Sequence, residues 1–155
     1  MPPQMWHNVL EINMATIPAK HAEIFQELLG LRSVSDRQLI EVIESQLPLE
    51  ALTRLKKHGI SSNEVYSLII NPRTLKHRRS KRQPLSKEES ERAIRLGRVL
   101  ATAEAVWGDE EAALKWMRTP KRRFDGRSPM EMLSTETGGR LVEEMLVQID
   151  EGMFA

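Results

Sequence analysis

The residues best suited to chemistry in this sequence form one short run, "NPRTLKHRRSKRQ", from Asn71 to Gln83. Six of its thirteen residues are Arg or Lys, one is His77, and none is acidic. Such cations neutralise nucleic-acid phosphates, and Arg can also donate two parallel hydrogen bonds to a guanine edge in the major groove. The run therefore indicates a surface for a polyanion. The alternatives are a solvated basic face or a loop that binds an acidic partner.

The distribution of charge favours the first interpretation. The chain has 155 residues and a net charge of +1, but residues 51–83 carry nine basic and one acidic residue, a net charge of +8. Residues 1–50 have a net charge of −4 and residues 84–155 a net charge of −3. A positive block between acidic flanks predicts one surface that contacts a polyanion, with the rest of the protein held away from it.

Other chemistry is poorly supported by the sequence. The chain has no Cys, and its four His residues show neither i, i+4 pairing nor a metal-ligand spacing; they are His7, His21, His58 and His77. No glycine-rich phosphate loop or nucleophile elbow occurs. We therefore expect no enzyme activity, no cofactor and no metal site. Without a signal peptide or an apolar run long enough to cross a bilayer, we expect a cytoplasmic protein with no membrane partner.

Apolar periodicity and capping residues predict an all-α fold. Two helices are expected before residue 48, one with Leu39, Ile40, Ile43 and Leu47 on a common face. Later helices are expected at about 48–59, 61–70, 72–83, 86–107, 109–119, 128–133 and 137–151. Asn71, Ser86, Asp109 and Ser128 are the expected N-caps.

A short helix, a tight connection and the basic helix together have the layout of a helix-turn-helix, which we place at about residues 48–83. Leu75 is the only clear apolar anchor of the basic helix. The residues predicted to contact DNA are Arg73, Thr74, Lys76, His77, Arg78, Arg79, Lys81 and Arg82.

The carboxyl-terminal third has a different character. Its last helix is amphipathic, and after Gly152 the chain ends in the apolar residues Met153 and Phe154. That tail either packs on the protein's own core or inserts into a partner. Trp107 ends the apolar face of the long helix and Trp116 follows on the next helix, so both rings are expected to be buried where the two halves meet.

Four segments carry a resemblance to a known family: "LPLEALTRLKKHGIS", "NPRTLKHRR", "LSKEESERAIRLGRVLATAEAVWGDEEAALKWMRTP" and "GRSPMEMLSTETGGRLVEEMLVQIDEGMFA". Over about residues 45–155 the chain resembles antitoxins of the Xre/ParS/MbcA type. The resemblance implies a phage-repressor-like helix-turn-helix domain at 46–108 and a small helical toxin-binding domain at 109–155. Residues 1–45 would form an N-terminal helical segment, partly disordered or dimerising.

The resemblance also implies partners. Such antitoxins bind a cognate RES-domain toxin, which consumes NAD, and cover its active-site cleft. They commonly repress their own operon by binding operator DNA, and they form homodimers. The residues assigned to toxin binding are Gly126, Arg127, Pro129, Met132, Leu133, Arg140, Val142, Met145, Ile149, Gly152, Met153 and Phe154. The alternative is a stand-alone helix-turn-helix repressor whose carboxyl-terminal domain only dimerises.

Overall fold

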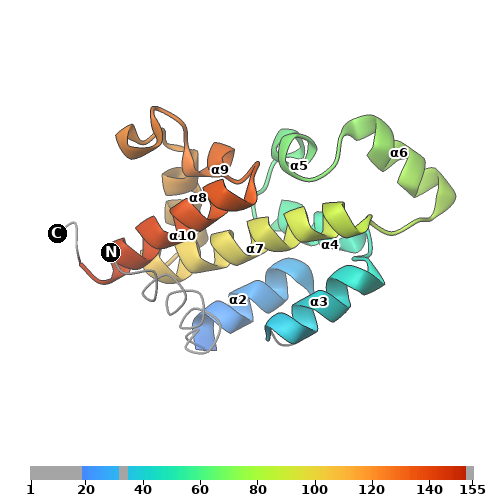
Figure 1. The fold of residues 1–155 in the computed structure, drawn as a ribbon, viewed down its shortest axis with the longest axis horizontal. Helices are drawn as coiled ribbons and strands as arrows, with labels where there is room; N and C mark the ends of the chain where they lie inside the picture. The colour runs from blue at the N-terminus through green and yellow to red at the C-terminus, as the bar shows by residue number, and fades with distance from the viewer. Residues whose placement is uncertain (1–18, 32–34, 153–155) are drawn as a thin grey trace.

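A computed structural model describes residues 19–31 and 35–152, and within these ranges the chain forms helices and no strand (Figure 1). The helices are α2 (Ala19–Leu29), α3 (Asp36–Ser45), α4 (Glu50–Lys57), α5 (Ser62–Leu68), α6 (Pro72–Lys81), α7 (Lys87–Trp107), α8 (Glu110–Arg118), the 3-10 turn η1 (Arg122–Phe124), α9 (Pro129–Met132) and α10 (Glu136–Asp150). The predicted all-α fold is confirmed. The segment around Arg122, expected as an irregular loop, contains the 3-10 turn.

The helices begin at the predicted caps. The Asn71 side chain accepts a hydrogen bond from the Thr74 amide at 2.8 Å, and Pro72 occupies the first turn of α6. Ser86 and Ser128 each form a capping box. The basic helix ends at Lys81, earlier than predicted, because Arg82 adopts a left-handed conformation with φ 52°. These contacts satisfy amide groups that the first turn of a helix leaves without partners.

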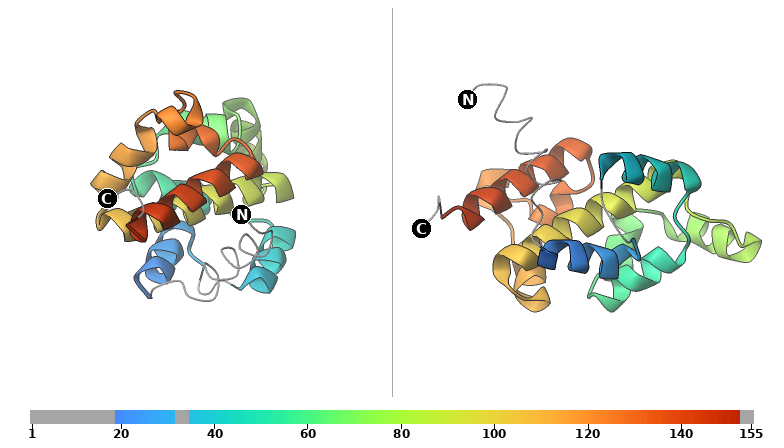
Figure 2. Two further views of the ribbon diagram at one scale, coloured as in Figure 1. Left: turned by 60° about the vertical axis from the view of Figure 1, so that its left-hand side comes forward. Right: turned by 90° about the horizontal axis from the view of Figure 1, so that it is seen from below.

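Helix α7 is the centre of the fold (Figures 1 and 2). It packs against α2, α3, α4, α5, α8 and α10. Ala93, Leu96, Leu100 and Ala103 are at most 1% exposed, as the sequence pattern predicts. A helix of 21 residues is about 30 Å long. It therefore reaches both the segment around α5 and α6 and the carboxyl-terminal helices.

The amino-terminal helices pack along this centre. A Cβ atom on Gly97 of α7 would lie only 2.7 Å from Leu29 Cδ1 of α2, so the missing side chain allows close approach of the two helices. Leu39 of α3 is buried and joins the same core. In the sequence, Thr16 could cap the first helix with Pro18 in its first turn, but both residues lie outside the described ranges.

Two apolar side chains are more exposed than predicted. Ile40 is 57% exposed because the face that α3 buries is narrow and centred on Leu39. Trp107 is 39% exposed because it ends α7, beyond the helices that enclose the rest of it. Trp116 is half-buried, with its ring centroid 6.2 Å from that of Trp107. The prediction that both Trp rings are buried is therefore wrong for Trp107.

His21 joins α2 to α7 through a buried contact. It is 5% exposed, and its Nε2 lies 2.8 Å from the Thr102 hydroxyl oxygen. That hydroxyl donates to the Arg98 carbonyl oxygen at 3.0 Å, so Nε2 carries the proton and donates to Thr102. Nδ1 has no hydrogen-bond partner among the described residues. Burial lowers the pKa of His21 from 6.5 to about 4.

This low pKa predicts that acid destabilises the fold. As the pH falls through 6.5, the unfolded chain binds the His21 proton while the folded chain does not, so stability is lost down to about pH 4. We expect a loss of about 2 kcal/mol from this group between pH 7 and pH 5. His21→Gln, which keeps a donor for Thr102, should reduce this loss in urea titrations, whereas His77→Gln should not. Parallel pH profiles for His21→Gln and the unmodified protein would exclude His21 as the titrating group.

Candidate nucleic-acid interface and partner-binding surface

The predicted helix-turn-helix is formed by α5, a three-residue connection and α6. Ile69 and Ile70 in the connection are 1% and 3% exposed, which fixes the turn to the core. The Arg92 guanidinium of α7 donates to the Ile69 carbonyl oxygen at 2.9 Å. Leu75, at 1% exposed, is the buried anchor of α6, as predicted. Helix α6 is thus held along one side and leaves the other side open.

The open side of α6 carries the basic residues. At about 100° per residue, Arg73 and His77 fall on the face opposite Leu75, and Lys76 lies about 100° from Leu75 on the flank of that face. All three side chains are exposed, as are Arg79, Lys81 and Arg82. Helix α6 lies at one end of the long axis, away from the carboxyl terminus of α10 (Figure 1). A straight nucleic-acid surface could therefore approach α6 without meeting the carboxyl-terminal helices.

Two of the predicted DNA-contacting residues face inward. Thr74 is half-buried, and Arg78 uses its guanidinium to bind Glu89, with both nitrogen-to-oxygen distances 3.1 Å. Glu89 is 7% exposed. Burial alone would raise the pKa of Glu89, but hydrogen bonds from Arg78 and Ser86 outweigh burial and hold it below the ordinary value. Arg78 therefore fastens α6 to the start of α7 instead of extending into solvent.

In the carboxyl-terminal part, α10 is held by close backbone contact and by ion pairs. A Cβ atom on Gly138 would lie 1.9 Å from the Met132 carbonyl oxygen, so only glycine fits there. The Arg98 Nε donates to Glu143 at 2.7 Å. Arg95 donates to Glu136 at 3.0 Å and to the Leu133 carbonyl oxygen at 3.2 Å. Helix α7 thereby positions both the start and the middle of α10.

The residues predicted to bind a toxin separate into two groups. Pro129, Met132, Leu133 and Val142 are buried in the domain's own core, and Val142 is 0% exposed. The prediction that these side chains form a contact surface is wrong for this conformation, because the core that they build covers them. The accessible residues are Gly126, Arg127, Arg140, Met145, Ile149 and Gly152. Met153 and Phe154 lie outside the described residues.

An apolar stripe on α10 replaces the buried residues as a candidate contact surface. Leu141, Met145 and Ile149 follow one another at intervals of four residues and so lie on one side of the helix. Leu141 is 42% exposed, and the other two are half-buried. Leu141 belongs to the apolar pattern of the amphipathic last helix but is not among the residues predicted to bind the toxin. We call these three residues the α10 stripe.

A second accessible group lies at the junction of α7 and α8. The Trp107 and Trp116 rings are tilted by 37° to each other, and the Lys121 ammonium lies 5.1 Å from the centroid of the Trp116 ring. This distance is within the range of a cation–π contact. Aromatic side chains with partial exposure are common anchors at protein interfaces.

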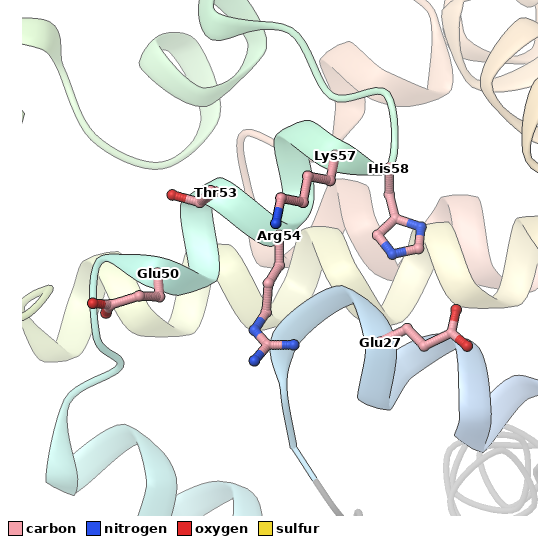
Figure 3. A pocket seen from close by; sticks show the side chains of 6 residues that line it. All are labelled: Glu27, Glu50, Thr53, Arg54, Lys57 and His58. Carbon is pink, nitrogen blue, oxygen red and sulfur yellow. The ribbon is translucent and has the colours of Figure 1, made fainter.

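The described surface also has an open pocket between α2 and α4, with a volume of about 450 Å³ (Figure 3). Glu27 comes from α2, and four residues come from α4, with His58 directly after them. The lining residues are acidic, basic or polar, and none is an apolar or aromatic hydrocarbon side chain of the kind that lines a typical small-molecule site. No helix among the described residues is long and apolar enough to span a membrane.

Comparison with known families agrees with this arrangement. Residues 38–98 match the antitoxin Xre-like helix-turn-helix domain. Residues 102–152 match the antitoxin Xre/MbcA/ParS C-terminal toxin-binding domain. The chain therefore carries the two domains of Xre/MbcA/ParS-type antitoxins. The two matched domains meet inside α7, so in this chain one continuous helix belongs to both domains.

Several curated relatives of the family are similar to the chain. Antitoxin Xre of Pseudomonas putida is 45% identical over 101 residues, which cover 65% of this chain and 64% of the relative. Antitoxin Xre of Yersinia enterocolitica is 37% identical over 87 residues, or 56% and 59% of the two chains. The Prs ADP-ribosylating antitoxin of Sphingobium is 29% identical over 98 residues, or 57% and 62%. The aligned part spans less than two thirds of each of these relatives.

The different environments of Arg78 and Arg79 give a prediction about stability. Arg78→Gln should lower the free energy of unfolding by about 1–3 kcal/mol, because it leaves the buried Glu89 carboxylate without its counterion. Arg79→Gln removes an exposed charge and should change it by less than about 0.5 kcal/mol. Urea denaturation measures both. Adding Glu89→Gln to Arg78→Gln should restore part of the loss, and equal stability of the two Arg variants would contradict the proposed structural role of Arg78.

Proposed function

We propose that this chain is the antitoxin of a type II toxin–antitoxin pair, that it neutralises a RES-domain toxin which consumes NAD, and that it represses its own operon by binding operator DNA. The observation that carries the proposal is the separation of two accessible surfaces at different places along one long helix. An exposed basic face lies on α6, and an exposed apolar stripe lies on α10. One molecule could then contact DNA and a protein at the same time.

The DNA-binding part of the proposal rests on α6. Arg73, Lys76 and His77 face outward from a helix that Leu75 and Arg78 hold in place. In helix-turn-helix proteins the start of the second helix contacts base edges, and flanking cations contact phosphates. On α6 no Asn or Gln is present to read adenine. We therefore propose that phosphate contacts supply most of the affinity and that Arg73 supplies the main base contact.

The toxin-binding part rests on the accessible surface of the matched domain at residues 102–152. The α10 stripe offers apolar area, and exposed Arg140 offers a cation directly before Leu141 in the helix; Arg127, before α9, is also exposed. We propose that this surface covers the active-site cleft of the toxin and that residues 153–155 extend the contact. The name of the Sphingobium relative refers to ADP-ribosylation, a reaction that takes its ADP-ribose group from NAD. That name supports a toxin of NAD-consuming chemistry.

Self-association of the carboxyl-terminal domain is the competing explanation for the α10 stripe. A stand-alone repressor would use this surface to form a homodimer, and no toxin would be needed. We propose that the protein is a homodimer, but that the α10 stripe is reserved for the toxin. The Leu141→Glu variant described below separates the two possibilities, because the two possibilities predict different effects of this variant on toxin binding and on oligomeric state.

The salt dependence of DNA binding tests the basic face. If about four phosphates are neutralised per subunit, a plot of log affinity against log salt concentration should have a slope of roughly −3 to −4 per subunit. Arg73→Gln with Lys76→Gln removes two exposed cations and should flatten the slope by about 1.8 per subunit. Arg37→Gln with Lys115→Gln removes two exposed cations elsewhere and should leave the slope unchanged. Equal slopes for the two double variants would show that α6 is not the DNA surface.

A charge placed on the α10 stripe tests the toxin surface. Burying a Leu side chain contributes about 1.5–3 kcal/mol, so Leu141→Glu should weaken toxin binding by roughly 10- to 100-fold in calorimetry and reduce neutralisation in cells. Ile40→Glu is the matched control, because it changes an aliphatic residue on α3 that is 57% exposed, compared with 42% for Leu141. Neither variant should lower the melting temperature appreciably. Full neutralisation by Leu141→Glu would show that the α10 stripe is not the toxin surface. A shift of Leu141→Glu from dimer to monomer, with an unmodified protein that binds no toxin, would favour the repressor interpretation.

A further inference from the structure

Three potential metal ligands come together at the interface of α4, α7 and α8. His58 follows the end of α4, Glu104 lies near the end of α7, and Glu110 is the first residue of α8. One ligand atom from each of the three lies within 4.8 Å of the other two. The His58 Nδ1 is 3.6 Å from the Glu110 carboxylate oxygen. The sequence gives no sign of this group, because more than forty residues separate His58 from both acids.

The distance between His58 and Glu110 is close to that which a small divalent ion requires. Zinc binds His nitrogen and carboxylate oxygen at about 2.0–2.2 Å, so neighbouring ligand atoms around a tetrahedral ion are about 3.3–3.5 Å apart. The observed 3.6 Å between His58 and Glu110 needs only a small adjustment of two partly exposed side chains. One imidazole with two carboxylates suits zinc and related transition ions, whereas calcium and magnesium prefer oxygen ligands alone.

Burial and charge also favour a cation at this place. Glu104 is 7% exposed, so its carboxylate would be a ligand largely shielded from water. The Glu110 carboxylate lies within 4.8 Å of Glu104, and two carboxylates at that separation repel each other when both are ionised. A divalent ion bound to both would remove the repulsion. His58 is reachable from solvent, since its ring lies at the edge of the pocket between α2 and α4 (Figure 3).

The charged residues around the pocket do not block the ion. Lys57 and Arg54 line the wall on the α4 side, and Glu27 and Glu50 line the same pocket (Figure 3). The two cations and the two carboxylates offset each other in net charge. His58 is the one of the three ligands that lines the pocket, so an ion could reach its ring from that side, where a water molecule could complete a fourth coordination position.

From this geometry we propose that His58, Glu104 and Glu110 bind one divalent transition-metal ion of the zinc type, which fastens α8 to α4 and α7. The ion would join the helix-turn-helix domain to the toxin-binding domain at the interface where two protein contacts already do so. Arg118 of α8 binds Glu64 at 2.7 Å and donates to the Gly59 carbonyl oxygen at 2.7 Å. The ion would make the relative position of the two domains depend on metal supply.

Titration of the isolated, tag-free full-length chain with zinc tests the site without DNA or toxin. After removal of metal with a chelator, calorimetry should show one ion bound per chain. At a free zinc concentration about 100-fold above the dissociation constant, the melting temperature should rise by about 5–10 °C. Cobalt(II), added in place of zinc, should give the intense visible absorption of a four-coordinate site.

Three substitutions decide which residues bind the ion. His58→Gln and Glu104→Gln should each weaken zinc binding by at least about 100-fold. Mutation of residues that only hydrogen-bond to a metal ligand already lowers metal affinity by about 10- to 100-fold. His77→Gln, at an exposed imidazole on α6, should leave the titration unchanged. If Glu104→Gln unfolds without metal, His58→Gln decides, since its side chain is partly exposed. Absence of saturable zinc binding to the unmodified chain, or equal binding by His58→Gln, would overturn the proposal.

Discussion

The burial of α7 on most of its sides is the constraint on which the rest of the structure depends. Six helices pack against α7. The helix carries acidic and basic side chains along its length as well as apolar ones, so apolar packing alone does not account for its contacts. Each of these polar groups needs a partner when water is excluded. Glu89 binds Arg78, Arg92 binds the turn after α5, and Arg98 binds Glu143. Polar groups on α7 thus fix the helices around it in one arrangement.

These contacts relate the two proposed surfaces to a single rigid element. At one end, the Glu89 and Arg92 contacts hold α6 and the turn before it, so the basic face has a defined direction. Toward the other end, Arg95 and Arg98 hold α10 and its apolar stripe. Because both surfaces depend on the same helix, a partner that moved α10 relative to α7 would act on the element that also positions α6. This gives a physical route for communication between partners bound at the two proposed surfaces.

The interface between α8 and the helix-turn-helix domain adds a second connection. Arg118 binds Glu64, whose carboxylate also completes the capping box at the start of α5. Burial would raise the pKa of Glu64, but hydrogen bonds from Arg118 and Ser61 hold it below the ordinary value. The same interface contains the group of His58, Glu104 and Glu110. The domains are therefore joined by charged contacts on α8 as well as by the shared helix.

The sequence by itself determined the all-α class, the helix starts and the basic face, because these depend on local spacing and on side chains that bond to their own backbone. Asn71, Ser86 and Ser128 cap helices wherever those helices are placed. It also indicated the family through local motifs. Local spacing is a weaker guide to exposure, as Ile40 and Trp107 show, because helical periodicity fixes a face but not how much of it a neighbour covers.

Only the tertiary structure decided which residues are available for function. It buried Val142 and Leu133, left Leu141 accessible, and turned Arg78 from a DNA contact into a partner of Glu89. It also brought His58 next to Glu104 and Glu110, and Arg118 next to Glu64. These contacts join residues that are eleven to more than fifty positions apart. A pattern in one segment holds no information about such contacts, because they depend on how separate helices pack against α7.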